Sequence, residues 1–162
     1  MVNYKKHILF TIILLSGILA IYGSIKYINK HNSDPTNEMK TYFVNHNAEF
    51  TKLVILAEAN PLILRVDMVS FTPSNVPSKT VKDIRASLSA LNLSIFERVS
   101  SSIRLFGDKS ISSSDGRYSY GYVYTPNPPQ TTFSRLVEIK PKDGIGHVPI
   151  SGNWYLIGFY EE

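Results

Sequence analysis

The feature that most constrains this chain is an uncharged, strongly apolar run over residues 8–25. Eighteen residues of α-helix span ~27 Å, which is close to the ~30 Å hydrocarbon core of a bilayer. Tyr22 and Tyr27 stand where an interfacial aromatic belt is expected, and the Lys26 side chain can extend toward water. The run therefore predicts a transmembrane helix over residues 8–28, with the lipid bilayer as its partner.

A cleaved signal peptide is the alternative, because Lys5 and Lys6 precede the apolar run. Signal cleavage requires small residues at positions −3 and −1 of the cut. A cut after Gly23 would place Ile21 at position −3. The sequence offers no clean cleavage site, and it favours an uncleaved signal anchor.

The anchor divides the chain into a short tail and one small domain. A seven-residue tail with two lysines is harder to translocate than the C-terminal domain, so we expect the N-terminus inside. Residues 1–7 would be cytoplasmic, 29–37 a juxtamembrane linker, and 38–162 an extracytoplasmic domain. We expect a single-pass (bitopic) protein of a bacterial-type inner, cytoplasmic membrane, with its domain in the periplasm or outside.

The charge balance argues against a nucleic-acid partner. The chain has 17 Lys and Arg, of which four precede Asp34, so 13 remain against 13 acidic residues. A nucleic-acid-binding domain needs clustered positive charge to neutralise phosphates. The absence of cysteine also excludes disulfide scaffolds and thiol nucleophiles. We therefore expect no nucleic-acid partner.

The rest of the chain predicts an α+β domain, in which two helices pack on a mostly antiparallel sheet of about five to six strands. Asp34 and Pro35 mark the start of the first helix, which we expect to run to Ala59 with its apolar stripe buried. Ser78 or Thr80 would cap the second helix, which ends near Leu91. Candidate strands for this sheet lie at residues 62–71, 93–99, 102–106, 109–114, 117–125, 133–140, 148–150 and 154–160.

Within the first of these strands, alternation predicts one buried face made of Leu62, Leu64, Val66 and Met68.

Residues 117–125, RYSYGYVYT, carry four tyrosines at a strict period of two. On a strand their rings project from one face, ~6.7 Å apart. Such a face can bind a glycan or an extended peptide, but a ladder half covered by a helix is the more ordinary interpretation. The candidate binding residues are Tyr118, Tyr120, Tyr122, Tyr124 and the adjacent Arg117.

Other potential reactive groups form no recognisable catalytic or metal-binding motif. His46 and Glu49 have metal-ligand spacing on a helix, but His31 and His147 are the only other imidazoles that could complete a site. A carboxylate pair would have to come from two different strands, with Asp67 and Glu138 as partners. We therefore predict no catalytic residues, no metal site and no cofactor.

These observations leave three hypotheses for function. The first is a membrane-anchored protein-interaction domain, acting as an inhibitor, an immunity protein or an accessory subunit, with another envelope protein as its partner. The second is a cell-wall or glycan-binding module that uses the tyrosine face. The third is a hydrolase with an unrecognised site, and we consider an enzyme the less favoured class.

Overall fold

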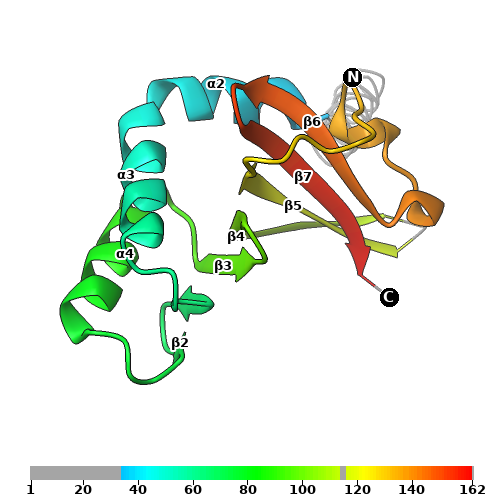
Figure 1. The fold of residues 1–162 in the computed structure, drawn as a ribbon. Coiled ribbons are helices and arrows are strands. Elements are labelled where there is room, and N and C mark those ends of the chain that lie inside the picture. Colours follow the sequence, from blue (N-terminus) through cyan, green and yellow to red (C-terminus); the bar gives the residue numbers. More distant parts are fainter. Residues whose placement is uncertain (1–33, 114–115, 162) are drawn as a thin grey trace, which may run out of the picture. The chain divides into compact units, whose positions relative to one another are not determined.

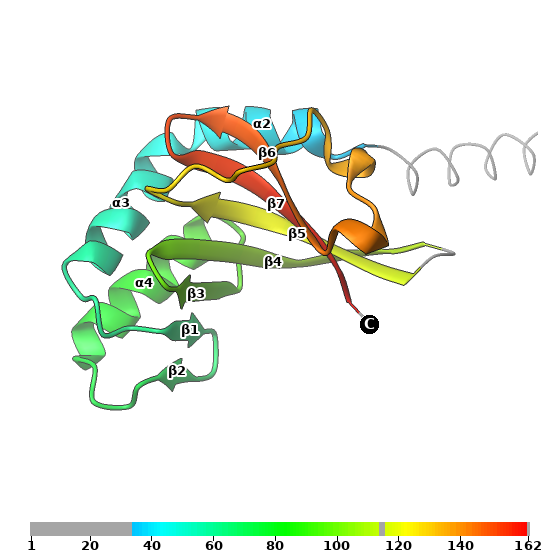
Figure 2. The same cartoon turned by 45° about the vertical axis from the view of Figure 1, so that its right-hand side comes forward.

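The computed structural model describes residues 34–113 and 116–161. Within these ranges three α-helices lie on one face of a seven-stranded antiparallel sheet (Figures 1 and 2), which confirms the α+β class. The expected two helices and about five to six strands are thus too few. The helices are α2 (Thr36–Asn45), α3 (Asn47–Glu58) and α4 (Ser78–Ala90), with short 3-10 helices η1 (Leu136–Glu138) and η2 (Pro141–Asp143).

The sheet has the strand order β2-β1-β3-β4-β5-β7-β6, and every neighbouring pair is antiparallel. The strands are β1 (Arg65–Asp67), β2 (Phe71–Thr72), β3 (Ile95–Val99), β4 (Ser102–Ser113), β5 (Gly116–Tyr124), β6 (Ile145–Ser151) and β7 (Trp154–Glu161).

The expected anchor at residues 8–28 lies outside the described residues, as does most of the linker. Within the part of the chain that is described, no helix is long and apolar enough to cross a membrane. Asp34–Glu162 forms one compact unit.

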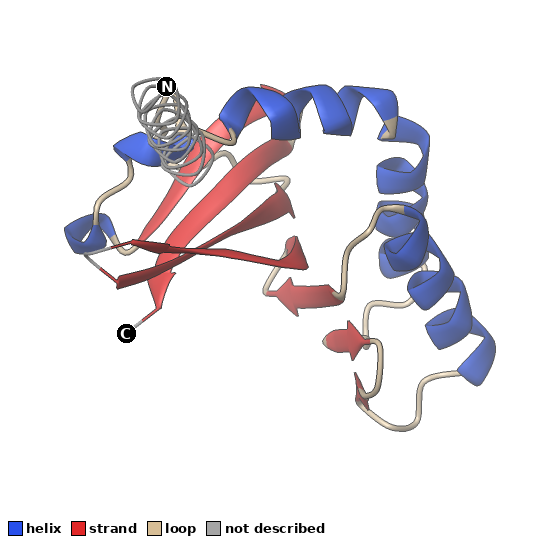
Figure 3. Cartoon of the chain, turned by 180° about the vertical axis from the view of Figure 1, so that it is seen from behind, coloured by secondary structure: helices blue, strands red, loops and turns tan. Residues whose placement is uncertain are grey.

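The helix predicted from Pro35 to Ala59 is interrupted at His46, whose φ of −120° and ψ of 19° are not helical. The His46 imidazole Nδ1 lies 2.8 Å from the carbonyl oxygen of Tyr42, and the two rings stack with centroids 4.0 Å apart. The break lets α2 and α3 run in different directions (Figures 1 and 3). As a result α2 reaches β7, whereas α3 packs against α4.

The predicted helix starts also need correction, although the apolar stripes are right. Pro35 rather than Asp34 is the N-cap residue of α2, and Pro77 rather than Ser78 or Thr80 is that of α4. The expected stripes are buried. They consist of Met39, Phe43, Phe50, Leu53, Val54 and Ala57 on α2 and α3, and of Val81, Ile84, Leu88 and Leu91 on α4 and its C-cap.

The strand predicted over residues 62–71 was wrong in both extent and orientation. Within this segment only the short strands β1 and β2 form, because residues 67–70 make a tight turn. In this turn the Asp67 carboxylate accepts hydrogen bonds from the Val69 and Ser70 amides. Ile63 and Val66 are the buried residues of this segment. Three of the four side chains expected inside, namely those of Leu62, Leu64 and Met68, are exposed.

Two further strand predictions also differ from the structure. Residues 102–106 and 109–114 were expected as two strands, but β4 runs continuously to Ser113 with a register shift between Phe106 and Ser110. Residues 133–140 contain η1 and no strand, and this segment packs against β6 and β7 with Leu136 and Ile139 buried. The pairing of Gly146 with Gly158 leaves space that Ile139 fills.

The centre of the core is an aromatic cluster between the helices and the sheet. Phe43 of α2 and Phe50 of α3 have ring centroids 4.9 Å apart, and both rings pack on Trp154 of β7 and Tyr122 of β5. This cluster fixes α2 and α3 over β5 and β7, and it lies on the face of β5 that carries the four tyrosines.

Candidate functional site

The helices and η1 cover part of the tyrosine face of β5. Tyr118 is 8% exposed and Tyr122 is 4% exposed. The Tyr118 hydroxyl donates a hydrogen bond of 3.0 Å to the Leu136 carbonyl, and the Tyr122 hydroxyl donates one of 3.2 Å to the Met39 carbonyl. Burial raises the pKa of both phenols above their ordinary value of 10.0. Tyr118 and Tyr122 are therefore core residues whose polar atoms are satisfied.

The other two tyrosines are partly exposed. Tyr124 packs its ring edge-on against Trp154, with centroids 5.5 Å apart. Tyr120 lies near Tyr118, with ring centroids 6.2 Å apart, and borders a pocket. The side chain of Arg117 lies outside the described part of the chain. The four rings thus do not form one open surface, and Tyr120 is the partly exposed one that borders a pocket.

This pocket, which we call the α2 pocket, has a volume of about 130 Å³ and lies between α2, the sheet and the turn after α4. Its floor is formed by β4 and β5, where Gly107 contributes no side chain and the register of β4 shifts. The α2 pocket is lined by Pro35, Glu38, Met39, Tyr42, Leu91, Asn92, Leu93, Gly107, Tyr120, Gly121 and Tyr122.

The C-terminal end of α4 shapes the second wall of the α2 pocket. Asn92 adopts a positive φ of 48°, a conformation that asparagine tolerates better than most residues. The Leu93 amide bonds the Leu88 carbonyl, and the Asn92 amide bonds the Ser89 carbonyl, which is a Schellman motif. The motif changes the direction of the chain, so that residues 91–93 line the pocket on the side opposite α2.

Negative charge is available in the α2 pocket through Glu38. Burial, and secondarily the Glu38 carboxylate, raise the pKa of the Tyr120 phenol above its ordinary value. Among the side chains that the structure describes, no basic group forms an ion pair with Glu38. Glu38 and Tyr42 were not predicted as site residues, although their spacing of four places them on one helix face.

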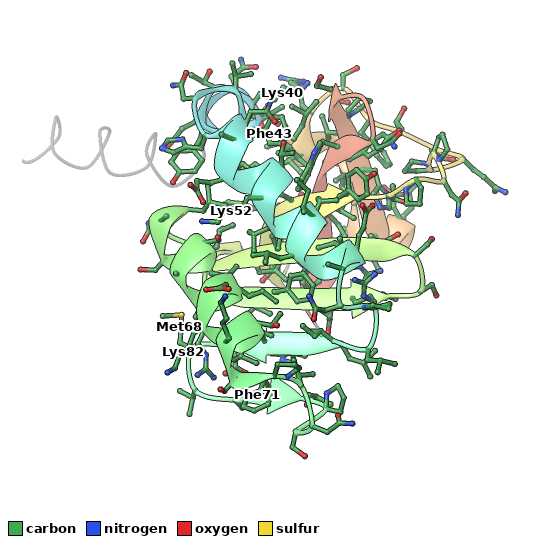
Figure 4. The ribbon with its side chains drawn as sticks, turned by 60° about the vertical axis from the view of Figure 1, so that its left-hand side comes forward. Lys40, Phe43, Lys52, Met68, Phe71 and Lys82 are labelled. Carbon is green, nitrogen blue, oxygen red and sulfur yellow. The ribbon has the colours of Figure 1, made fainter. Side chains whose placement is uncertain are left out.

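A second candidate surface lies on the segment from Leu62 to Val69, which we call the hairpin surface. Its apolar side chains are exposed: Leu62 by 71%, Leu64 by 50%, Met68 by 51% and Val69 by 92%. Figure 4 shows Met68 and Phe71 at the opposite end of the domain from Lys40 of α2.

The turn that presents Met68 and Val69 is held by Asp67. Its carboxylate accepts hydrogen bonds from the Ser70 hydroxyl at 2.7 Å and from the Val69 amide at 2.9 Å. The Arg85 guanidinium donates to the Asp67 and Ser70 carbonyls at 2.8 and 3.2 Å. The Met68 and Val69 side chains of the hairpin surface are therefore carried by an ordered turn.

The remaining candidate reactive groups are not brought together. Asp67 lies on β1, whereas Glu138 lies on η1, which packs on β6 and β7 beyond three intervening strands. Each carboxylate has a local basic partner, Arg65 and Arg135 respectively. Burial lowers the pKa of the half-buried His147. Among the described residues, no group of three His, Cys, Asp or Glu could hold a metal ion.

Comparisons of the chain with known protein families, curated proteins and solved structures found no match.

Proposed function

We propose that this chain is a membrane-anchored protein-interaction domain whose partner, another envelope protein, binds the hairpin surface. The observation that carries the proposal is the exposure of Leu62, Leu64, Met68 and Val69 on one short segment. Isolated exposed apolar residues are ordinary, but four within the eight residues 62–69, two of them on an ordered turn, are typical of interaction sites. The anchor at residues 8–28 rests on the sequence alone.

The way in which the turn is held supports binding over loose packing. Asp67 and Arg85 fix the backbone of residues 67–70 by hydrogen bonds that do not involve the Met68 and Val69 side chains. A preorganised turn loses little conformational entropy when a partner covers it. The glycan-binding alternative has less support, because it needs open tyrosine rings and two of the four are buried.

The test is affinity capture of the full-length chain, purified in detergent, with a photo-crosslinking residue at Val69. Captured envelope proteins are identified by mass, and capture is repeated with the double substitution Leu64→Ser and Met68→Ser, which leaves the crosslinking position unchanged. The matched control is Val44→Ser with Ile55→Ser, since these side chains are 67% and 61% exposed on α2 and α3.

We expect one partner whose capture falls about tenfold or more in the hairpin variant, since central interface residues often contribute ~2 kcal/mol. The control variant should capture that partner at the level of the unmodified chain. Equal capture by both variants would overturn the proposal, as would crosslinking at Val69 that yields no protein.

A further inference from the structure

We propose that the α2 pocket is a binding site for a quaternary ammonium group, held between Glu38 and the rings of Tyr42 and Tyr120. The inference is independent of the hairpin surface, because none of the four apolar residues of that surface lines this pocket. It concerns a small ligand rather than a protein partner.

The aromatic content of the pocket is the first reason. Three of its 11 lining residues are tyrosines: Tyr42 from α2, and Tyr120 and Tyr122 from β5. Aromatic rings attract cations through their negative faces, and several rings around one site are the usual way in which proteins bind quaternary ammonium groups.

Charge complementarity is the second reason. Glu38 is the one ionisable carboxylate among the lining residues, and no lysine, arginine or histidine lines the pocket. In the described part of the chain its carboxylate has no basic partner. A cation in the pocket would be attracted by the Glu38 carboxylate without having to displace a basic side chain from it.

The apolar lining favours a quaternary over a primary ammonium. A primary ammonium has three N–H donors that need acceptors when it leaves water. The side chains of Leu91, Leu93 and Met39 offer no oxygen or nitrogen acceptor to such donors. Methyl groups on nitrogen instead pack directly against such walls. The volume of about 130 Å³ suits a group of trimethylammonium size.

The experiment titrates the full-length chain, purified in a maltoside detergent that contains no choline group, with choline chloride at constant ionic strength. Calorimetry and tyrosine fluorescence measure the affinity. The uncharged tert-butyl isostere of choline and n-butylammonium are titrated in parallel. We expect saturable binding of choline, with the isostere and the primary amine each about fivefold or more weaker.

The variants test the two parts of the site separately. Glu38→Gln removes the charge and Tyr120→Leu removes a ring, and each should weaken choline binding about fivefold or more. Glu58→Gln, which removes an exposed carboxylate of α3 outside the pocket, should leave it unchanged. Melting curves of all three variants confirm that they remain folded.

Three results would overturn the inference: the absence of saturable choline binding by the unmodified chain, equal binding of the uncharged isostere, or tighter binding of n-butylammonium than of choline. Nanodiscs of phosphatidylcholine, compared with phosphatidylglycerol, identify the source of the cation. If only the phosphatidylcholine nanodiscs compete with choline for the pocket, the result would support a lipid headgroup as the ligand. If the two kinds of nanodisc behave equally, the result would support a free cation.

Discussion

Tyr120 and Tyr122 show how two identical side chains on one face of a strand can have different roles. The Tyr122 ring packs on Phe50 with centroids 4.7 Å apart, and its hydroxyl is hydrogen-bonded. Tyr120 is only partly buried, and it borders the α2 pocket. The difference comes from α2 and α3, which cover Tyr122 through the Met39 carbonyl and the Phe50 ring, whereas Tyr120 remains partly exposed.

Replacing each tyrosine by alanine should separate these roles. Tyr122→Ala deletes a buried ring and should lower the free energy of unfolding by ~3–5 kcal/mol. Tyr120→Ala deletes a partly exposed ring and should cost ~1 kcal/mol. Thermal unfolding of the full-length chain, followed by near-ultraviolet circular dichroism, measures both. Equal losses of stability would mean that α2 does not cover Tyr122 more closely than Tyr120.

The turn between β1 and β2 is stabilised by the ionised carboxylate of Asp67. Hydrogen bonds, first from the Ser70 hydroxyl and then from the Ser70 and Val69 amides, lower the pKa of Asp67 from 3.8 to about 2. Because the folded-state pKa lies below the unfolded one, the stabilisation is present above about pH 4. It is lost as the pH falls from about 4 to about 2.

Asp67→Asn should therefore be less stable than the unmodified chain at pH 7, and the difference should shrink as the pH falls from about 4 to about 2. Urea unfolding across this range measures the difference, and hydrogen exchange of the Val69 and Ser70 amides reports the turn directly. Ser70→Ala, which removes one donor to the carboxylate, should show a smaller effect of the same sign. A difference that does not change with pH would contradict this role for Asp67.

The elements differ in how well the sequence predicted them. The helical stripe from Met39 to Ala57 was predicted correctly, because burial follows helical spacing even across a one-residue break. The break itself was missed, since a histidine is not a strong helix breaker and His46 acts through contacts with Tyr42. For residues 62–71, alternation predicted one long strand, but Asp67 and Ser70 close a turn inside it.

The candidate sites were harder to predict than the elements. The strict period of the tyrosines correctly indicated a strand, but the helix that covers Tyr122 comes from residues about 80 positions earlier. The α2 pocket needs α2, the turn after α4 and the shift in β4 together. Such long-range packing leaves no local signal, so Glu38 and Asn92 were not identified from sequence.

At the scale of the whole molecule, the described domain presents two different surfaces. The α2 pocket includes Pro35 and Glu38, close to where the described chain begins, and the hairpin surface lies at the other end of the domain (Figures 1 and 4). Lys and Arg balance Asp and Glu from Asp34 onward. Neither surface therefore depends on a large net charge, and recognition at each rests on local chemistry.

The proposed anchor leads to the last prediction, which concerns membrane topology. Because the sequence has no clean cleavage site, the mature protein should retain residues 1–30, and Lys5 and Lys6 should hold the N-terminus in the cytoplasm. Protease added to bacterial spheroplasts that express the chain should then digest the domain but not a tag placed before Met1. Immunoblots against both ends, with N-terminal sequencing, give the result. A mature N-terminus near residue 24, or a domain protected until the membrane is lysed, would show that the apolar run is not an anchor of this orientation.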